Sequence, residues 1–129
     1  MIKIYLAGAI DGIDKKTARA WRNRIKKILP KNYVCLIPKI TDNLFESVNF
    51  DKFLINQADI ILANIYKTPS WGTAMEIFYG HQLGKNVICF TLEDAEFHSW
   101  IKYHSTNCLD VECLEEVVDY LKHLEGFQK

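Results

Sequence analysis

The stretch "DIILAN", residues 59–64, places four apolar residues in a row between two polar ones. A strand with one face in water alternates polar and apolar side chains, whereas a strand covered on both faces is apolar throughout. The run is too short for a buried helix and has no helical spacing of its own. It therefore predicts a central strand of a parallel sheet that carries helices on both faces.

The segments on either side of this run alternate between strand-like and helix-like patterns. Short apolar runs predict further strands over 2–8, 33–38, 86–91 and, more briefly, 108–111. Apolar residues at helical spacing predict helices over 15–29, 49–58, 72–84 and 114–124. Right-handed crossovers turn this order into a doubly wound, Rossmann- or flavodoxin-like α/β domain with a five-stranded parallel sheet. We expect residues 1–129 to form this one domain.

The helix predicted over 49–58 is the least regular of the four. Its apolar residues indicate that Phe50, Phe53, Leu54 and Ala58 turn inward. Asp51 stands near its start, where a carboxylate commonly caps the helix.

Composition narrows the class of protein. Lys and Arg together number 16, as do Asp and Glu, so no net charge attracts nucleic acid. The longest apolar run, at 60–63, is far too short to span a bilayer, and the N-terminal residues lack the pattern of a signal peptide. The four cysteines form no CxxC pair, which favours free thiols over disulfides or zinc. These features predict a soluble cytoplasmic domain without a metal.

Ligands of doubly wound sheets bind beyond the carboxyl ends of the strands, where the strand order reverses. Three segments should meet there: "AGAIDG" at 7–12, "NIYKTPSWG" at 64–72 and "TLEDAEFHSW" at 91–100. The first contains glycines whose turn can present backbone N–H groups to a phosphate. It has neither GxGxxG nor GK[ST], so a plain tight turn is an equal alternative.

Two carboxylates are candidates for chemistry at this edge. Glu76 follows Gly72 by about one helical turn and has apolar neighbours, which is how a nucleophile or a general base is built. The alternative is a first-turn carboxylate that interacts with the helix dipole. Asp51 is either a helix N-cap or a partner of Glu76, since cleavage of a sugar bond uses two carboxylates.

The segment "HSWIKYHS", residues 98–105, mixes two histidines and two serines with aromatic rings. Such a mixture suits an interface between subunits, where rings bury area and polar tips reach a ligand. The alternative is a surface loop whose rings fold onto its own core. His98 and His104 either contact a substrate or lie at the surface.

Together these segments resemble the nucleoside 2-deoxyribosyltransferase superfamily, in particular its nucleoside 5′-monophosphate N-glycosidase branch. The resemblance covers residues 2–121. It rests on "IYLAGAI", an aspartate upstream of "ADIILAN", the block "SWGTAMEIFYGHQLGKNVI", and "HSWIKYHS". It implies a nucleoside deoxyribosyltransferase-like enzyme that uses no cofactor and whose homodimers, or higher homo-oligomers, share their active sites.

The resemblance also implies roles for single residues. Glu76 matches a glutamate that attacks the sugar C1, and Asp51 an aspartate that assists the leaving base. Tyr5 matches a tyrosine that orients this glutamate, although simple packing in the strand is an alternative. The residues expected to border the substrate are Gly8, Ala9, Ile10, Asp11, Ser70, Trp71, Gly72, Ser99 and Trp100.

Two serines favour a phosphorylated substrate. Ser70 stands where the nucleoside transferases carry an acid for the 5′-hydroxyl, and a neutral donor is compatible with a phosphate. Ser99 matches a serine that a neighbouring subunit gives to the same phosphate. Asp11 departs from the pattern, because the nucleotide hydrolases carry an arginine there. Arg19, Arg22 or Lys102 would then have to supply the positive charge.

The predicted function is hydrolysis of the N-glycosidic bond of a (deoxy)nucleoside 5′-monophosphate to a free base and (deoxy)ribose 5-phosphate. The alternatives are exchange of bases by 2-deoxyribosyl transfer, cleavage of the nicotinamide bond of NAD, and nucleotide sensing without catalysis. The expected partner is thus a small nucleotide or nucleoside, and neither nucleic acid nor a membrane.

Overall fold

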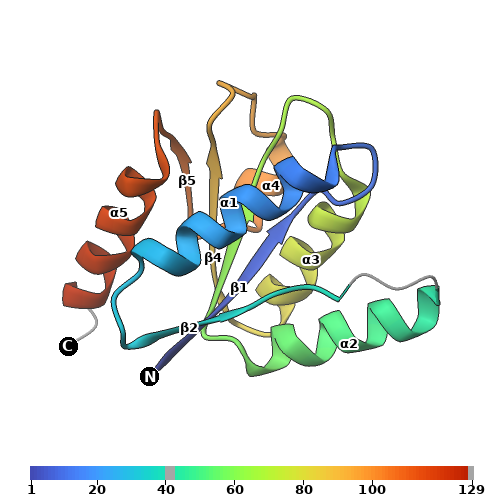
Figure 1. The fold of residues 1–129 in the computed structure, drawn as a ribbon, viewed down its shortest axis with the longest axis horizontal. Coiled ribbons are helices and arrows are strands. Elements are labelled where there is room, and N and C mark those ends of the chain that lie inside the picture. The colour runs from blue at the N-terminus through green and yellow to red at the C-terminus, as the bar shows by residue number, and fades with distance from the viewer. Residues whose placement is uncertain (40–42, 128–129) are drawn as a thin grey trace.

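The computed structural model describes residues 1–39 and 43–127 and contains one parallel sheet in the order β2-β1-β3-β4-β5 (Figure 1). Its strands are β1 (Ile2–Gly8), β2 (Tyr33–Leu36), β3 (Ile60–Asn64), β4 (Asn86–Thr91) and β5 (Asn107–Asp110). The helices are α1 (Lys15–Ile28), α2 (Leu44–Gln57), α3 (Trp71–Gln82), α4 (Ser99–Tyr103) and α5 (Leu114–Phe127). The predicted five-stranded doubly wound sheet is confirmed.

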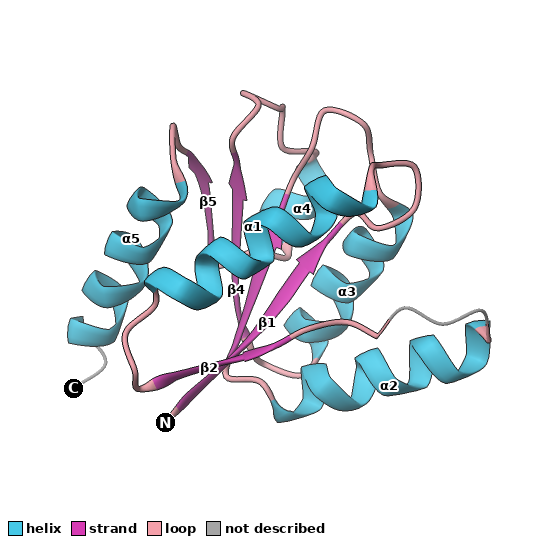
Figure 2. Cartoon of the chain, in the orientation of Figure 1, coloured by secondary structure: helices cyan, strands magenta, loops and turns pink. Residues whose placement is uncertain are grey.

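The sheet separates two apolar cores, one on each face. On β1, Ile4 and Leu6 join the core under α1 and α5, while Tyr5 and Ala7 join the core under α2 and α3. Figure 2 shows α1 crossing in front of the strands. Every residue of β3 is buried, as expected of a central strand covered on both faces. Strand order reverses between β1 and β3, which is where such sheets bind ligands.

Helix α2 differs from its prediction. It begins at Leu44, with the Asn43 side chain accepting a hydrogen bond from Glu46 N at 3.1 Å. Asp51 is therefore not the N-cap but lies in the second half of the helix. The first turns of α2 extend past the sheet (Figure 1). Further along the helix, Phe50 and Phe53 stay 39% and 57% exposed instead of turning inward, whereas Ala58 is buried as expected.

Helix α4 occupies part of the segment "HSWIKYHS", for which the sequence left two alternatives, a subunit interface or a surface loop. Its single turn begins after His98, whose Nδ1 accepts from Trp100 N at 3.1 Å. None of the helices in the described part of the chain is long and apolar enough to cross a membrane.

Gly80 brings α3 close to the sheet, and this predicts an effect on stability. A Cβ at residue 80 would lie 2.8 Å from Ile61 Cγ1, whose side chain is fully buried. Gly80→Ala should therefore lower the free energy of unfolding by about 1–3 kcal/mol, despite the better helix propensity of alanine. Urea unfolding measures the change. Gly72→Ala in the same helix meets nothing within 4 Å and is the matched control. Equal stability of the two variants would contradict the close packing.

Candidate active site

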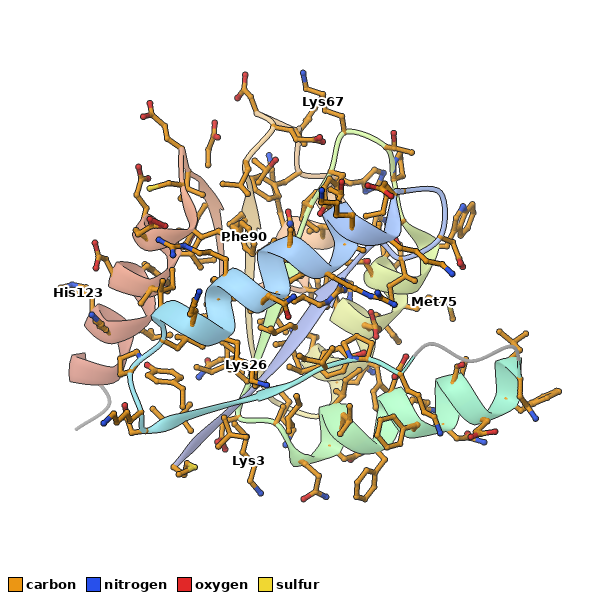
Figure 3. The ribbon with its side chains drawn as sticks, viewed as in Figure 1. Lys3, Lys26, Lys67, Met75, Phe90 and His123 are labelled. Atoms are coloured by element: carbon orange, nitrogen blue, oxygen red, sulfur yellow. The ribbon has the colours of Figure 1, made fainter. Side chains whose placement is uncertain are left out.

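A cavity of about 840 Å³ opens at the carboxyl edge of the sheet. Its walls come from the segments that follow β1, β2 and β3, and from helices α2, α3 and α4. Met75, labelled in Figure 3, belongs to the α3 wall. Of the segments expected at this edge, those after β1 and β3 contribute directly, whereas 91–100 contributes only Trp100. The volume suits a ligand of nucleotide size.

Tyr5 and Glu76 form the central contact of the site. Tyr5 is fully buried on the face of β1 that packs against α3, and its hydroxyl donates a hydrogen bond to Glu76 Oε2. Burial is the main cause that raises the pKa of Tyr5 far above its ordinary value, so the phenol remains a neutral donor. The carboxylate of Glu76 is thereby held in one orientation at the cavity wall.

Glu76 lies in the second turn of α3, because the helix begins at Trp71 with Ser70 as N-cap. It is thus not the first-turn capping carboxylate that the sequence allowed. Burial raises the pKa of Glu76 to about 7; the Tyr5 hydrogen bond opposes this shift, the nearby Asp51 carboxylate adds to it, and Arg22 opposes it. Near neutral pH such a group can act as a nucleophile or exchange a proton.

Asp51 faces the same cavity from α2. Its Oδ1 accepts a hydrogen bond from Lys39 N at 2.9 Å, which ties the helix to the segment after β2. Burial raises the pKa of Asp51, while the Lys39 hydrogen bond and the charge of Arg22 oppose the increase. Two carboxylates from distant parts of the chain therefore line one cavity.

The other predicted site residues fall into two groups. Those that line the cavity are Gly8, Ile10, Asp11, Ser70, Trp71, Gly72 and Trp100. Ala9 is buried and Ser99 is exposed, and neither lines this cavity. The roles assigned to all of them stay predictions.

The N-terminus of α3 opens into the cavity. Ser70 Oγ accepts hydrogen bonds from Thr73 N at 3.3 Å and from Thr73 Oγ1 at 2.9 Å. Since both of these bonds use its lone pairs, the Ser70 hydroxyl proton can still be donated to a ligand. A helix N-terminus also carries partial positive charge, which favours anions.

Sequence reasoning missed the lysines of the site. Lys39 and Lys52 line the cavity; Lys39 Nζ lies 2.8 Å from Glu46 Oε1, and Lys52 Nζ lies 4.8 Å from the centre of the Tyr79 ring. Lys39 follows the carboxyl end of β2, a position that points to this edge in any parallel sheet. No such pattern marks Lys52, because the direction of its side chain depends on the residue at which α2 begins.

His104 is one of the two histidines for which the sequence left a substrate contact and a surface position open. It is buried, lines the cavity, and stacks on Trp100 with ring centres 5.7 Å apart. The rings of Phe78, His81 and Tyr103 also contact it. The structure thus places His104 in the cavity wall and not at the outer surface. Within residues 1–39 and 43–127, no group of three or more His, Cys, Asp and Glu side chains is placed to hold a metal ion.

Several solved structures have a fold similar to that of this chain. A 2-deoxyribosyltransferase from Bacillus psychrosaccharolyticus superposes with a TM-score of 0.73 at 22% identity, over 92% of this chain and 91% of that one. A Leishmania mexicana 2-desoxiribosyltransferase gives 0.70 at 23%, over 93% and 96%. A Clostridium botulinum CMP N-glycosidase gives 0.69 at 18%, over 93% and 98%.

No protein-family model matches the sequence, and no curated protein matches it either. The structural matches show that the chain shares its fold with these two deoxyribosyltransferases and this N-glycosidase.

The raised pKa of Glu76 predicts a pH-dependent stability difference. The folded protein binds this proton more tightly than the unfolded chain, so the folded state loses stability as pH rises from the ordinary glutamate pKa of 4.5 to the raised pKa of about 7. Glu76→Gln avoids this penalty. Its free energy of unfolding should exceed that of the wild type by up to about 3 kcal/mol at pH 8 and by little at pH 4.

Urea unfolding at both pH values measures this difference. Glu112→Gln, an exposed substitution on the loop before α5, is the control and should follow the wild type at each pH. A Glu76→Gln variant that gains nothing between pH 4 and pH 8 would show that Glu76 is not held in a desolvated position.

Proposed function

We propose that the protein hydrolyses the N-glycosidic bond of a (deoxy)nucleoside 5′-monophosphate, releasing a free base and (deoxy)ribose 5-phosphate. The observation that carries this proposal is the Glu76 carboxylate, oriented by the Tyr5 hydroxyl, with Asp51 in the wall of the same cavity. Paired carboxylates of this kind cleave sugar bonds through oxocarbenium-like transition states.

In the proposed reaction, the ionised Glu76 attacks C1 of the sugar while the bond from C1 to the base nitrogen breaks. The bonding electrons pass to the base, which Asp51 protonates directly or through one water. The resulting glycosyl ester on Glu76 is then attacked at C1 by water. The proton of the water passes to Asp51, the ester bond breaks, and the Glu76 carboxylate and the sugar phosphate are released. The Tyr5 hydrogen bond to Oε2 holds the Glu76 carboxylate in place for this attack.

Three features of the cavity wall are compatible with a 5′-phosphate. Ser70 offers a neutral donor at the N-terminus of α3, and Lys39 and Lys52 are cations in the walls, although Lys39 also pairs with Glu46. Asp11, Asp51 and Glu76 supply negative charge to the same cavity. The support for a phosphate therefore comes from Ser70, the helix N-terminus and Lys52, and not from the total charge of the cavity.

A homodimer that shares its sites is part of the proposal. Apolar and aromatic side chains around the cavity mouth are exposed in the single chain, among them Trp71 at 87%, Met75 at 71% and Trp100 at 68%. Ser99 begins α4, is exposed, and does not line the cavity of its own chain. Pairing through these helices would cover the apolar groups and offer Ser99 to the neighbouring site.

Transfer of 2-deoxyribose between bases is the second candidate. It is favoured by the structural likeness to the Bacillus and Leishmania enzymes. In that reaction, an acceptor base instead of water takes the sugar from Glu76. A free acceptor base added to the assay separates the two, because only the transferase forms a new nucleoside or nucleotide.

Release of free base tests the proposed function. Wild-type protein incubated with nucleoside monophosphates, nucleosides or NAD should release base from a monophosphate. Glu76→Gln should lower this rate by at least about 100-fold, or roughly 3 kcal/mol in barrier height, because the neutral amide cannot attack C1. Glu112→Gln, which is exposed and outside the cavity, should keep full activity. Release of base by folded Glu76→Gln at the wild-type rate would refute the mechanism.

Mixed dimers test the shared site. Glu76→Gln and Ser99→Ala should each be nearly inactive, and unfolding and refolding them together should restore activity towards about a quarter of wild type for random pairing. The recovery arises because a mixed dimer contains one site with both residues intact. Light scattering measures the oligomeric state. A monomer, or a mixture no more active than its parents, would show that each chain builds its own site.

A further inference from the structure

Two cysteines lie side by side in the sheet, and neither lines the cavity. Cys89 on β4 and Cys108 on β5 are direct partners in the parallel register. Partners of this kind point to the same face, and both thiols belong to the core on the α2 and α3 side of the sheet. Cys89 is fully buried, whereas Cys108 is half-buried on β5, the edge strand (Figure 1). Both thiols are free, and the proposed reaction uses neither of them.

The spacing of the two strands permits a bond between the sulfurs. Neighbouring strands lie about 4.8 Å apart, within the range of about 4.4–6.8 Å that separates the Cα atoms of a disulfide. The Cβ atoms must approach to about 3.8 Å, so β5 has to move slightly toward β4. β5 has four residues and pairs with β4 alone, so this movement does not disturb a further strand. A bridge that must be drawn closed in this way is also easily reduced again.

The two thiols differ in how readily they ionise. The hydrogen bond from the Cys89 thiol is the main cause that lowers the pKa of Cys108; burial opposes this shift, while Ser105 and the charge of Lys102 add to it. The same hydrogen bond and burial raise the pKa of Cys89. The thiolate is the form that attacks a disulfide, so Cys108 is the better nucleophile of the pair. It is also the thiol that a small molecule can reach, since Cys89 is fully buried.

Hydrogen bonds join this pair to the cavity wall. Ser105 Oγ lies 3.1 Å from Cys89 Sγ and donates to Ile101 O at 2.6 Å. Because the one proton of the Ser105 hydroxyl is on this carbonyl, Ser105 accepts from the Cys89 thiol. Ile101 lies in α4 and lines the cavity. The proton of Cys89 therefore contributes to the attachment of α4 to β4.

We propose that Cys89 and Cys108 form a redox-active dithiol, which a low-molecular-weight disulfide oxidises to a covalent bond between β4 and β5. The proposal does not depend on the reaction at Glu76. In the oxidised protein Cys89 has no proton to donate, so its hydrogen bond to Ser105 is lost and α4 is held less firmly beside the cavity.

The reaction proceeds in two steps. First, the Cys108 thiolate attacks one sulfur of the small disulfide, whose sulfur–sulfur bond breaks. One thiol leaves with the proton that Cys108 has lost, and Cys108 carries a mixed disulfide. Second, Cys89 gives up its proton and attacks Cys108 Sγ, which expels the second thiol with that proton. The two cysteines lose two electrons and two protons in total, and the small disulfide is reduced to two thiols.

Oxidised glutathione is the small disulfide for the test. Fully reduced wild-type protein is incubated with it at pH 7, free thiols are alkylated, and the peptides are mapped by mass spectrometry. A linked pair of peptides that contains Cys89 and Cys108 should form. Cys113 is the internal control, because it is exposed and outside the pair. Cys108 should be oxidised at least about threefold faster than Cys113, since its thiolate is more populated.

Cys89→Ala separates the two steps. This variant lacks the second thiol, so Cys108 should stop at the mixed disulfide and gain the mass of one glutathione. Cys108→Ala should leave Cys89 reduced, because the buried thiol cannot start the reaction. Cys113→Ala is the matched control and should form the bridge at the wild-type rate.

The wild-type protein alone can overturn the inference. If Cys113 is modified while Cys89 and Cys108 stay reduced, the pair has no reactivity of its own. If Cys108 of the wild type stops at the mixed disulfide, the strands do not approach closely enough for the bridge. Either result would overturn the proposal, whether or not the variants fold and whether or not the protein releases base.

Discussion

The hydrogen bond from the Tyr5 hydroxyl to Glu76 is the contact on which the site depends. It joins the inner strand β1 to helix α3; Tyr5 is fully buried and Glu76 is partly buried. β1 is fixed on both sides by parallel pairing with β2 and β3, so the tyrosine has little freedom. In the proposed reaction, a carboxylate held this way need not be reoriented before it attacks, which is how positioned groups accelerate chemistry.

The electrostatics of the site is a balance between burial and a small number of charges. Burial and Asp51 favour the protonated form of Glu76, while Tyr5 and Arg22 favour the ionised form. The result, a pKa of about 7, leaves the group able to exist in both forms near neutral pH. The Asp51 carboxylate adds to the raised pKa of Glu76, so a substitution at Asp51 should also change the titration of Glu76.

The sheet was predictable from the sequence because β3 and β4 are apolar without interruption and helical patterns separate the strands. Glu76 was found for the same reason, since it lies on a well-marked helix at the ligand edge. Asp51 was found as a candidate, but its place in α2 was wrong, because the cap at Asn43 lies before a stretch without clear periodicity. The positions of the Lys52 and Arg22 side chains could not be predicted from the sequence. Local patterns do not tell which side chains reach a distant cavity or the end of another strand.

The position of β1 has a consequence for synthesis of the chain. β1 is made before either of its neighbours, yet β2 and β3 begin only at Tyr33 and Ile60. At roughly 5–20 residues per second on the ribosome, its backbone N–H and C=O groups stay unpaired for several seconds until β3 is made. During that time "IKIYLAG" is an apolar strand with two open edges, and Lys3 is the charge that discourages its pairing with other nascent chains. The strand that anchors the site is thus also the segment most exposed to aggregation before the domain closes.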